Sequence, residues 1–176
     1  NKTLIFTATY NEKDNIKKLI EKINSINIDL DLLVVDDNSP DKTWEILKKL
    51  EEKNKNLKVI IRNNKSGLDT AHKLAFDYGK SNGYKKFISM DADLSHDPLE
   101  IPKIINELEN FPFVIGSRYI AGGKCEMAGF RLLLSILGNK IIKYFLKIDC
   151  NEFTTSYRGF NLSMLEKFDF NLINSK

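Results

Sequence analysis

The sequence has few of the features that mark nucleic-acid-binding, disulfide-rich or membrane-spanning proteins. The formal net charge of its 176 residues is only +3, too small to predict nucleic acid as a partner. Its two cysteines, Cys125 and Cys150, have no CxxC or zinc-ligand spacing, so we expect isolated, reduced thiols, as in the cytosol. No unbroken apolar run is long enough to span a bilayer. An ordinary globular domain is therefore expected.

Several common catalytic motifs are also missing from the sequence. No GxGxxG follows the first apolar run, which argues against a dinucleotide-binding Rossmann domain. No GxxxxGK[ST] is present, which argues against a P-loop kinase or GTPase, and no GxSxG points to a hydrolase. The two histidines, His72 and His96, are far apart in the sequence, and a hydrogen-bonding role for His96 is as open as a catalytic one.

Short apolar runs alternate with helical patterns along the chain. The sequence predicts strands at residues 3–8, 31–37, 57–62, 84–90 and 113–118. Helical patterns occupy the intervals, beginning near residues 14, 41, 68 and 98. This alternation predicts an α/β fold with a Rossmann-like, mostly parallel sheet that carries helices on both faces. The length suits one domain.

Two aspartates, Asp91 and Asp93, follow the fourth predicted strand. Carboxylates one residue apart can share a divalent cation, which prefers oxygen ligands. The same pattern also occurs in turns, because Asp side chains bond their own backbone. Polar groups also follow the first two strands, at residues 10–12 and 36–37. Since ligands of such sheets bind at the carboxyl ends of the strands, three clusters there predict a site.

The segments after the predicted strands carry motifs that occur together in a known family. They are Tyr10–Glu12, Val35–Asp41, Gly67–Leu68, Met90–His96 and Gly116–Tyr119. In this order they resemble the inverting family 2 of GT-A glycosyltransferases, and most of all the polyprenyl-phosphate sugar transferases, the dolichol-phosphate mannosyltransferase group. The resemblance implies a single GT-A catalytic domain, the nucleotide-diphospho-sugar transferase fold, over residues 1–176.

The resemblance also implies which positions bind the nucleotide. The residues expected to line its pocket are Ala8, Tyr10, Glu12, Val35 and Asp37, with Asp91 and Ala92 against the nucleotide.

A metal ion, Mg²⁺ or Mn²⁺, is implied at the Asp pair. Asp93 would ligate the ion that holds the diphosphate, and Asp91 and Ser95 are the further predicted ligands. Arg118 would face the phosphates and Arg131 would lie near the acceptor phosphate. Asp93, Arg118 and Arg131 are therefore the predicted catalytic residues.

The sequence departs from the family pattern at several positions. Ser95 stands where many relatives have Gln as a metal ligand, and Ala8 stands where Pro is usual. Glu152 opens a segment, residues 152–158, that usually opens with Asp. The region that closes the site with basic residues in relatives has no counterpart here, so we expect a truncation at the C-terminus.

The implied reaction transfers a sugar, with mannose favoured, from GDP-mannose or UDP-glucose to a polyprenyl or dolichyl phosphate with inversion. The acceptor is already an anion, since a phosphate monoester has a second pKa of about 6, and it needs no strong base. Arginines would position it, and Arg131 and Arg158 are the candidates. Two alternatives remain open. Transfer to a glycan or lipid hydroxyl would need a carboxylate base, for which Glu152 is the candidate, and a non-catalytic module would only bind nucleotide sugar.

Residues 130–147 form a strongly apolar helical segment with four basic residues, Arg131, Lys140, Lys143 and Lys147. Such a helix can lie in a membrane interface and bring an enzyme to a lipid acceptor. Because apolar residues occur nearly all round, a core or interdomain helix is the equal alternative. With a lipid acceptor, the expected location is peripheral, at the cytoplasmic face of a membrane.

Overall fold

The computed structural model describes residues 2–120, 123 and 129–167, so Cys125 lies outside the described residues. Its strands are β1 (Thr3–Thr9), β2 (Leu30–Asp36), β3 (Leu57–Ile61), β4 (Lys86–Ser89), β5 (Phe113–Ile115) and β6 (Arg158–Asn161). Its α-helices are α1 (Ile16–Asn24), α2 (Thr43–Glu51), α3 (Leu68–Ser81), α4 (Ile101–Glu107) and α5 (Gly129–Leu146). Two short 3-10 helices are η1 (Pro98–Glu100) and η2 (Leu162–Lys167).

The strands form one sheet in the order β3-β2-β1-β4-β6-β5. Strands β1 to β4 pair in parallel, whereas β6 runs antiparallel to both β4 and β5. The mostly parallel α/β prediction is confirmed. Strand β6 was not predicted, because four residues that include Gly159 give little apolar pattern.

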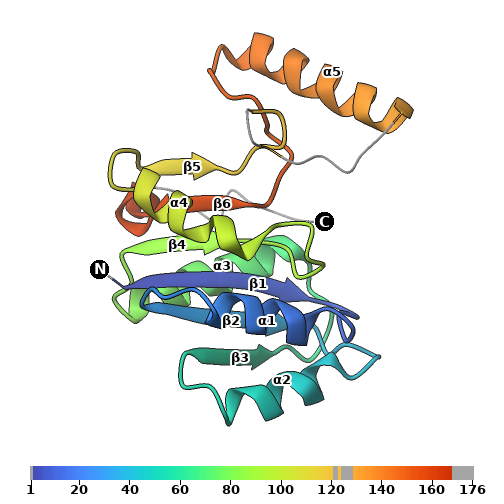
Figure 1. Ribbon diagram of the computed structural model, residues 1–176, viewed down its shortest axis with the longest axis vertical. Helices are drawn as coiled ribbons and strands as arrows, with labels where there is room; N and C mark the ends of the chain where they lie inside the picture. Colours follow the sequence, from blue (N-terminus) through green and yellow to red (C-terminus); the bar gives the residue numbers. More distant parts are fainter. Residues whose placement is uncertain (1, 121–122, 124–128, 168–176) are drawn as a thin grey trace.

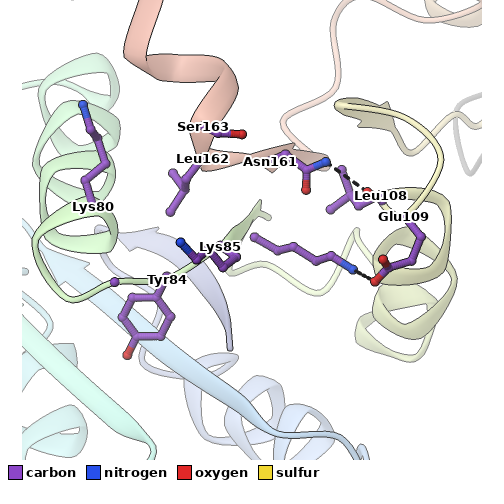
Figure 2. Close-up of a pocket in the computed structure, with 10 residues that line it drawn as sticks. Lys80, Tyr84, Lys85, Leu108, Glu109, Asn161, Leu162 and Ser163 are labelled. Carbon is purple, nitrogen blue, oxygen red and sulfur yellow. Dashed lines mark hydrogen bonds and ion pairs between the residues drawn. The ribbon is translucent and has the colours of Figure 1, made fainter. Parts of the chain in front are cut away.

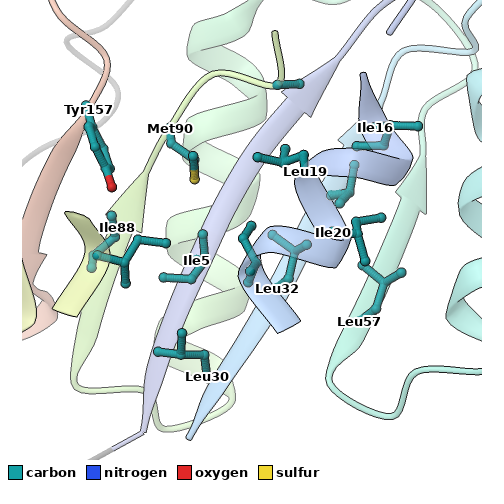
Figure 3. Packing of buried hydrophobic residues seen from close by; sticks show 14 of the residues in the cluster. Ile5, Ile16, Leu19, Ile20, Leu30, Leu32, Leu57, Ile88, Met90 and Tyr157 are labelled. Atoms are coloured by element: carbon teal, nitrogen blue, oxygen red, sulfur yellow. The ribbon is translucent and has the colours of Figure 1, made fainter. Parts of the chain in front are cut away.

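Helices cover both faces of the sheet (Figure 1). On one face, apolar residues of α1, α2 and α4 pack on β1 to β4. Figure 3 shows Ile16, Leu19 and Ile20 of α1 set against Ile5 and Leu32 of the sheet. On the other face, α3 and η2 pack on the same strands through residues such as Phe76 and Leu162. Because β1, β2 and β4 are buried on both faces, they are mostly apolar runs, whereas the edge strand β3 exposes Lys58.

The chain arrangement brings several loops to one edge of the sheet. The chain moves from β1 outward to β2 and β3, and β4 then pairs on the other side of β1. Ligands of such sheets bind at this reversal, outside the carboxyl ends of the strands. Arg158, the first residue of β6, pairs with both Ser89 at the end of β4 and Ile115 at the end of β5. Residues 152–157, here called the connector, therefore arrive at the same edge.

Helix α5 stands apart from the sheet, beyond β5 (Figure 1). Its large side chains are mostly exposed, with 72% of Phe130, 79% of Tyr144 and 76% of Phe145 accessible. The helix is tied to the rest of the described chain through Asn139, whose Oδ1 accepts a 2.7 Å hydrogen bond from the backbone N–H of Phe153. The segment is thus a helix, as predicted, but it is not a buried core helix.

None of the helices in the described ranges combines the length and the apolar character needed to cross a membrane.

Candidate functional site

Asp93 lies in a tight loop directly after β4. Its Oδ1 accepts a 3.0 Å hydrogen bond from the backbone N–H of Ser95, and the loop is closed by Leu94 at a φ of 66°. Burial acts to raise the pKa of Asp93. The hydrogen bonds from Ser95 and the nearby His96 outweigh that effect and hold the pKa below its ordinary value. Asp93 is therefore an ionised, exposed carboxylate at the carboxyl edge of the sheet.

Among the described residues, Asp91, in contrast to Asp93, is bound by a residue from outside its own loop, Ser156. Its backbone N–H donates to Nδ1 of His96 at 3.0 Å, and its Oδ1 accepts from the Ser156 hydroxyl at 2.5 Å. Its other oxygen, Oδ2, lies 3.8 Å from Nε2 of His96. Burial lowers the pKa of His96, although Asp91 and Asp93 act in the opposite direction. The neutral imidazole therefore accepts at Nδ1, which gives His96 a hydrogen-bonding role.

The two acids at the end of β2 have separate functions. Asp36 is fully buried and accepts hydrogen bonds from Thr9 and Ser39, which fixes the turn after β2. Asp37 forms a two-point ion pair with Arg62, at 2.5 Å to Nε and 2.8 Å to Nη2. We did not identify Arg62 as a site residue from the sequence, although it directly follows β3 and thus lies at the same edge of the sheet as Asp37. The structure therefore places Asp37 at the predicted edge, already paired with a cation.

The other predicted nucleotide-binding residues are unequally accessible. Tyr10 is exposed, and Nζ of Lys65 lies 4.0 Å from the centre of its ring. Glu12 is half-buried and accepts a 2.9 Å hydrogen bond from Asn15. Val35, in contrast, has no exposed surface.

Val35 packs in the core on the α3 side of the sheet, and half-buried Ala8 packs against the same cluster. Ala92 is likewise almost fully buried, in the core on the other face. The side chains of Val35 and Ala92 are thus almost entirely buried in this conformation, and their place in the nucleotide pocket stays a prediction. The roles of the accessible residues stay predictions.

Arg118 is bound to the connector through Glu152. The backbone N–H and Nε of Arg118 each donate to the carboxylate at 2.8 Å, and its Nη2 donates to Oε1 as well. Glu152 is 0% exposed, whereas 34% of the Arg118 side chain is accessible. The pair fixes the chain after β5 to the connector. The Arg118 side chain is thus fixed by Glu152 and remains partly accessible at this edge.

Of the two arginines predicted to position the acceptor, the structure describes the side chain of Arg158 but not that of Arg131. Arg131 lies on α5, but its side chain is outside the described part of the structure. Arg158 donates from Nε to the Thr155 carbonyl at 2.7 Å and from Nη2 to the Phe153 carbonyl at 2.9 Å. Arg158 therefore stabilises the connector, and among the described residues it pairs with no carboxylate.

Residues 91–97, between β4 and η1, are here called the Asp loop. Their oxygen groups fit a divalent cation that arrives with a diphosphate. In the described part of the chain, no three His, Cys, Asp or Glu side chains gather as a ready cation site. The loop offers the carboxylates of Asp91 and Asp93 and the hydroxyl of Ser95, which are hard oxygen donors. Mg²⁺ usually binds one or two carboxylates together with substrate phosphates, so this donor set is sufficient. The three ligands stay a prediction.

A cavity of about 440 Å³ lies at the opposite edge of the sheet, away from the Asp loop. Figure 2 shows Lys85 and Tyr84 on one side of it and Glu109 and Asn161 on the other. The buried Lys86 ammonium is paired there with Glu109 and the Ile105 carbonyl. Since no predicted site residue lines this cavity, its position does not alter the location of the candidate site.

Comparisons with known proteins agree with the fold and the motifs. A family model described as glycosyl transferase family 2 matches residues 4–169. A polyprenol monophosphomannose synthase of Mycolicibacterium smegmatis is 33% identical over 99% of this chain and 67% of its own length. An undecaprenyl-phosphate mannosyltransferase of Micrococcus luteus is 30% identical over 99% of this chain and 72% of its length.

A solved structure shares the fold at lower sequence identity. The mannosyltransferase PcManGT from Pyrobaculum calidifontis, in complex with GDP-Man and Mn²⁺, has a TM-score of 0.64 and 17% identity. The match covers 94% of this chain and 46% of the PcManGT chain, so the sequence spans less than half of that structure.

Proposed function

The chain belongs to glycosyl transferase family 2, and on this premise we propose that it transfers mannose from a nucleotide sugar, GDP-mannose, to a polyprenyl phosphate with inversion. The family agrees with the one expected from the motifs. The polyprenyl-phosphate acceptor is taken from the relatives, which are named for mannosyl transfer to such lipids. UDP-glucose remains the second donor to test.

The burial of Glu152 supports a phosphate acceptor over a hydroxyl. A hydroxyl acceptor needs a general base within about 3 Å of its proton. Glu152, the candidate base, has no exposed surface, and Arg118 binds its carboxylate through three hydrogen bonds. It cannot reach a hydroxyl in this conformation. A phosphate monoester is already largely deprotonated at neutral pH, with a second pKa of about 6, and requires no such base.

The residues at the carboxyl edge suit the donor side of the reaction. When bound, Mg²⁺ or Mn²⁺ offsets the negative charge of the departing diphosphate as a Lewis acid. Asp93, ionised at neutral pH, and Asp91 are the residues that would hold it. Arg118, whose side chain is fixed by Glu152 and 34% accessible, would place its positive charge near the same diphosphate. Tyr10 offers an exposed ring for the nucleobase.

Helix α5 suits an approach to the membrane that carries the lipid acceptor. Exposed large side chains such as Phe130, Tyr144 and Phe145 lie on the same helix as Lys140 and Lys143. Apolar and basic residues together favour the surface of an anionic bilayer. We therefore propose peripheral association through α5, at the cytoplasmic face as the sequence led us to expect.

Transfer of labelled mannose tests the proposal. The protein is incubated with Mn²⁺, vesicles that contain a polyprenyl phosphate, and labelled GDP-mannose, with labelled UDP-glucose in a parallel reaction. We expect label from GDP-mannose in an acid-labile lipid, and none when the lipid lacks its phosphate. Label only in a glycan would contradict the phosphate acceptor. Binding of GDP-mannose without any transfer would support the non-catalytic alternative.

A further inference from the structure

The connector contacts the Asp loop through three consecutive residues, Thr155, Ser156 and Tyr157. Thr155 Oγ1 lies 3.3 Å from Nε2 of His96. The Tyr157 ring stacks on the His96 ring, with centroids 4.9 Å apart and planes 17° from parallel. The Tyr157 hydroxyl donates to the Asp97 carbonyl at 2.9 Å. Together with the Ser156–Asp91 hydrogen bond, these contacts hold the Asp loop against a segment about sixty residues further along the chain.

The connector is itself fixed in place. The hydroxyl of Ser89, the last residue of β4, donates to the Ser156 carbonyl at 2.7 Å. Arg158 donates to the carbonyls of Phe153 and Thr155, and Tyr157 is almost fully buried. The Ser156 hydroxyl is therefore presented to Asp91 from a rigid backbone, and little rotational freedom is lost when the hydrogen bond forms.

We propose that Ser156 is a positioning residue for the cation site, which orients the Asp91 carboxylate toward the diphosphate; this rests on the proposed function. The Ser156 hydroxyl donates to Oδ1, and His96 Nδ1 accepts from the Asp91 backbone N–H. Oδ2 is then the carboxylate oxygen directed away from Ser156. A carboxylate fixed in this way binds a cation at lower entropic cost than a rotating one, which is how hydrogen bonds to metal ligands act elsewhere.

Binding of Mn²⁺ in the presence of GDP tests the proposal without requiring transfer. The variants of the full chain are Ser156→Ala, which removes the hydroxyl, Ser156→Thr, which restores it, and Ser163→Ala, an exposed serine of η2 at the opposite edge. Calorimetry gives the dissociation constant of Mn²⁺ for each. Loss of a hydrogen bond to a metal ligand typically weakens binding about 10-fold or more. We expect that weakening for Ser156→Ala, and wild-type affinity for the other two.

A structural role alone would give a different result. If Ser156→Ala binds Mn²⁺ as tightly as the wild type, the proposal is overturned. The same holds if Ser156→Thr, folded by circular dichroism, is as weak as Ser156→Ala. Should Ser156→Ala not fold, Ser156→Cys takes its place, because a thiol is a much weaker hydrogen-bond donor of similar size; weakened Mn²⁺ affinity then supports the proposal and wild-type affinity overturns it.

Transfer assays separate this proposal from the proposed function. With increasing Mn²⁺, we expect Ser156→Ala to recover mannose transfer, with an unchanged KM for the polyprenyl phosphate. A wild-type protein that binds Mn²⁺ and GDP, is weakened by Ser156→Ala and yet transfers no mannose would contradict the proposed function alone. Wild-type transfer with no effect of Ser156→Ala on Mn²⁺ would contradict the positioning role alone.

Discussion

Asp91 and Asp93 are one residue apart, yet their carboxylates have different surroundings. Asp93 is exposed, and among the described residues its carboxylate accepts from within its own loop, at Ser95. Asp91 is bound through its carboxylate by Ser156 and through its backbone N–H by His96. Asp93 therefore has the freer oxygens for a cation, and Asp91 has the fixed ones. The family resemblance predicts different roles for the two acids, Asp93 on the metal and Asp91 against the nucleotide, and these roles stay predictions.

Replacement of Asp93 tests its role as the main metal ligand. Asp93→Asn keeps the shape of the side chain and the acceptor for the Ser95 N–H but removes the charge. We expect loss of Mn²⁺-dependent mannose transfer by at least about 100-fold, the upper range for metal-site changes, with an unchanged melting temperature. Asp77→Asn, at an exposed position on α3, is the matched control and should behave as wild type. An active Asp93→Asn variant would refute the metal assignment.

Because the Glu152 carboxylate is buried, we expect replacement of its partner Arg118 to destabilise the fold. Arg118→Ala leaves a fully buried charge without its partner, which typically costs about 3 kcal/mol of the free energy of unfolding. Adding Glu152→Gln should restore part of that loss, since an amide carries no charge, while transfer stays low. Urea unfolding measures both variants.

Lys143→Ala is the control for this prediction. Lys143 pairs with Asp149, whose side chain is 96% exposed, and ion pairs at such exposed positions contribute little to stability. If Arg118→Ala costs no more than Lys143→Ala, the Arg118–Glu152 pair is not needed to stabilise the fold.

At the scale of single elements, the position of strand β6 depends on Gly159, which has no side chain. A Cβ added at Gly159 would lie 2.5 Å from Cγ2 of Ile104 and 3.0 Å from Cδ1 of Leu108. Both are buried on the α4 side of the sheet, where they cannot move freely. Glycine therefore lets α4 approach β6 closely, and the connector that precedes β6 is placed as a consequence.

Gly159→Ala should lower the free energy of unfolding by about 1–3 kcal/mol, the usual cost of an overpacked core. Chemical denaturation measures the change. Gly138→Ala, in the middle of α5, is the control, because its added Cβ meets nothing within 4 Å and alanine favours a helix. Equal stabilities of the two variants would show that β6 and α4 adjust without cost.

The exposed apolar side chains of α5 lead us to predict that this helix binds membranes. The double change Tyr144→Ser and Phe145→Ser removes two of the most exposed large side chains of the described chain. Since burying one such side chain contributes about 1.5–3 kcal/mol, binding to anionic vesicles should fall at least tenfold in a sedimentation assay. Phe111→Ser, which changes an exposed aromatic residue outside α5, should leave binding intact. Equal losses in both would show that α5 is not the contact.

At the scale of the whole molecule, the sequence predicted the parts that depend on local pattern. The runs that became β1, β2 and β4 are apolar because they are buried on both faces, and the strand order predicts that Asp37, Asp91 and Asp93 lie at one edge of the sheet. The contacts of Glu152 and Ser156 depend on antiparallel pairing of β6 with β4. A strand of four residues carries no sequence pattern that predicts its pairing partner. The sequence therefore could not show that Glu152 lies beside Arg118 and Ser156 beside Asp91.

The stability of the whole fold should depend on pH through His72. Its ring packs against Phe6 at 4.9 Å, between α3 and β1. Burial lowers the pKa of His72 below its ordinary value of 6.5, and the nearby Arg158 acts in the same direction, while Asp91 and Asp69 oppose it. The unfolded chain therefore binds a proton at His72 more readily than the folded protein does. As pH falls below about 6.5, the free energy of unfolding should decrease, until the pH is below the folded pKa as well.

Urea unfolding between pH 7.5 and pH 5 measures this dependence. His72→Phe keeps a ring against Phe6 and Phe76 but has no proton to bind. Carboxylates such as Asp93, whose pKa values are lowered, change stability only at more acidic pH, below their ordinary value of 3.8. The difference in stability between His72→Phe and wild type should therefore grow in favour of the variant as pH falls through 6.5. A constant difference over this range would show that His72 binds protons equally in the folded and unfolded states.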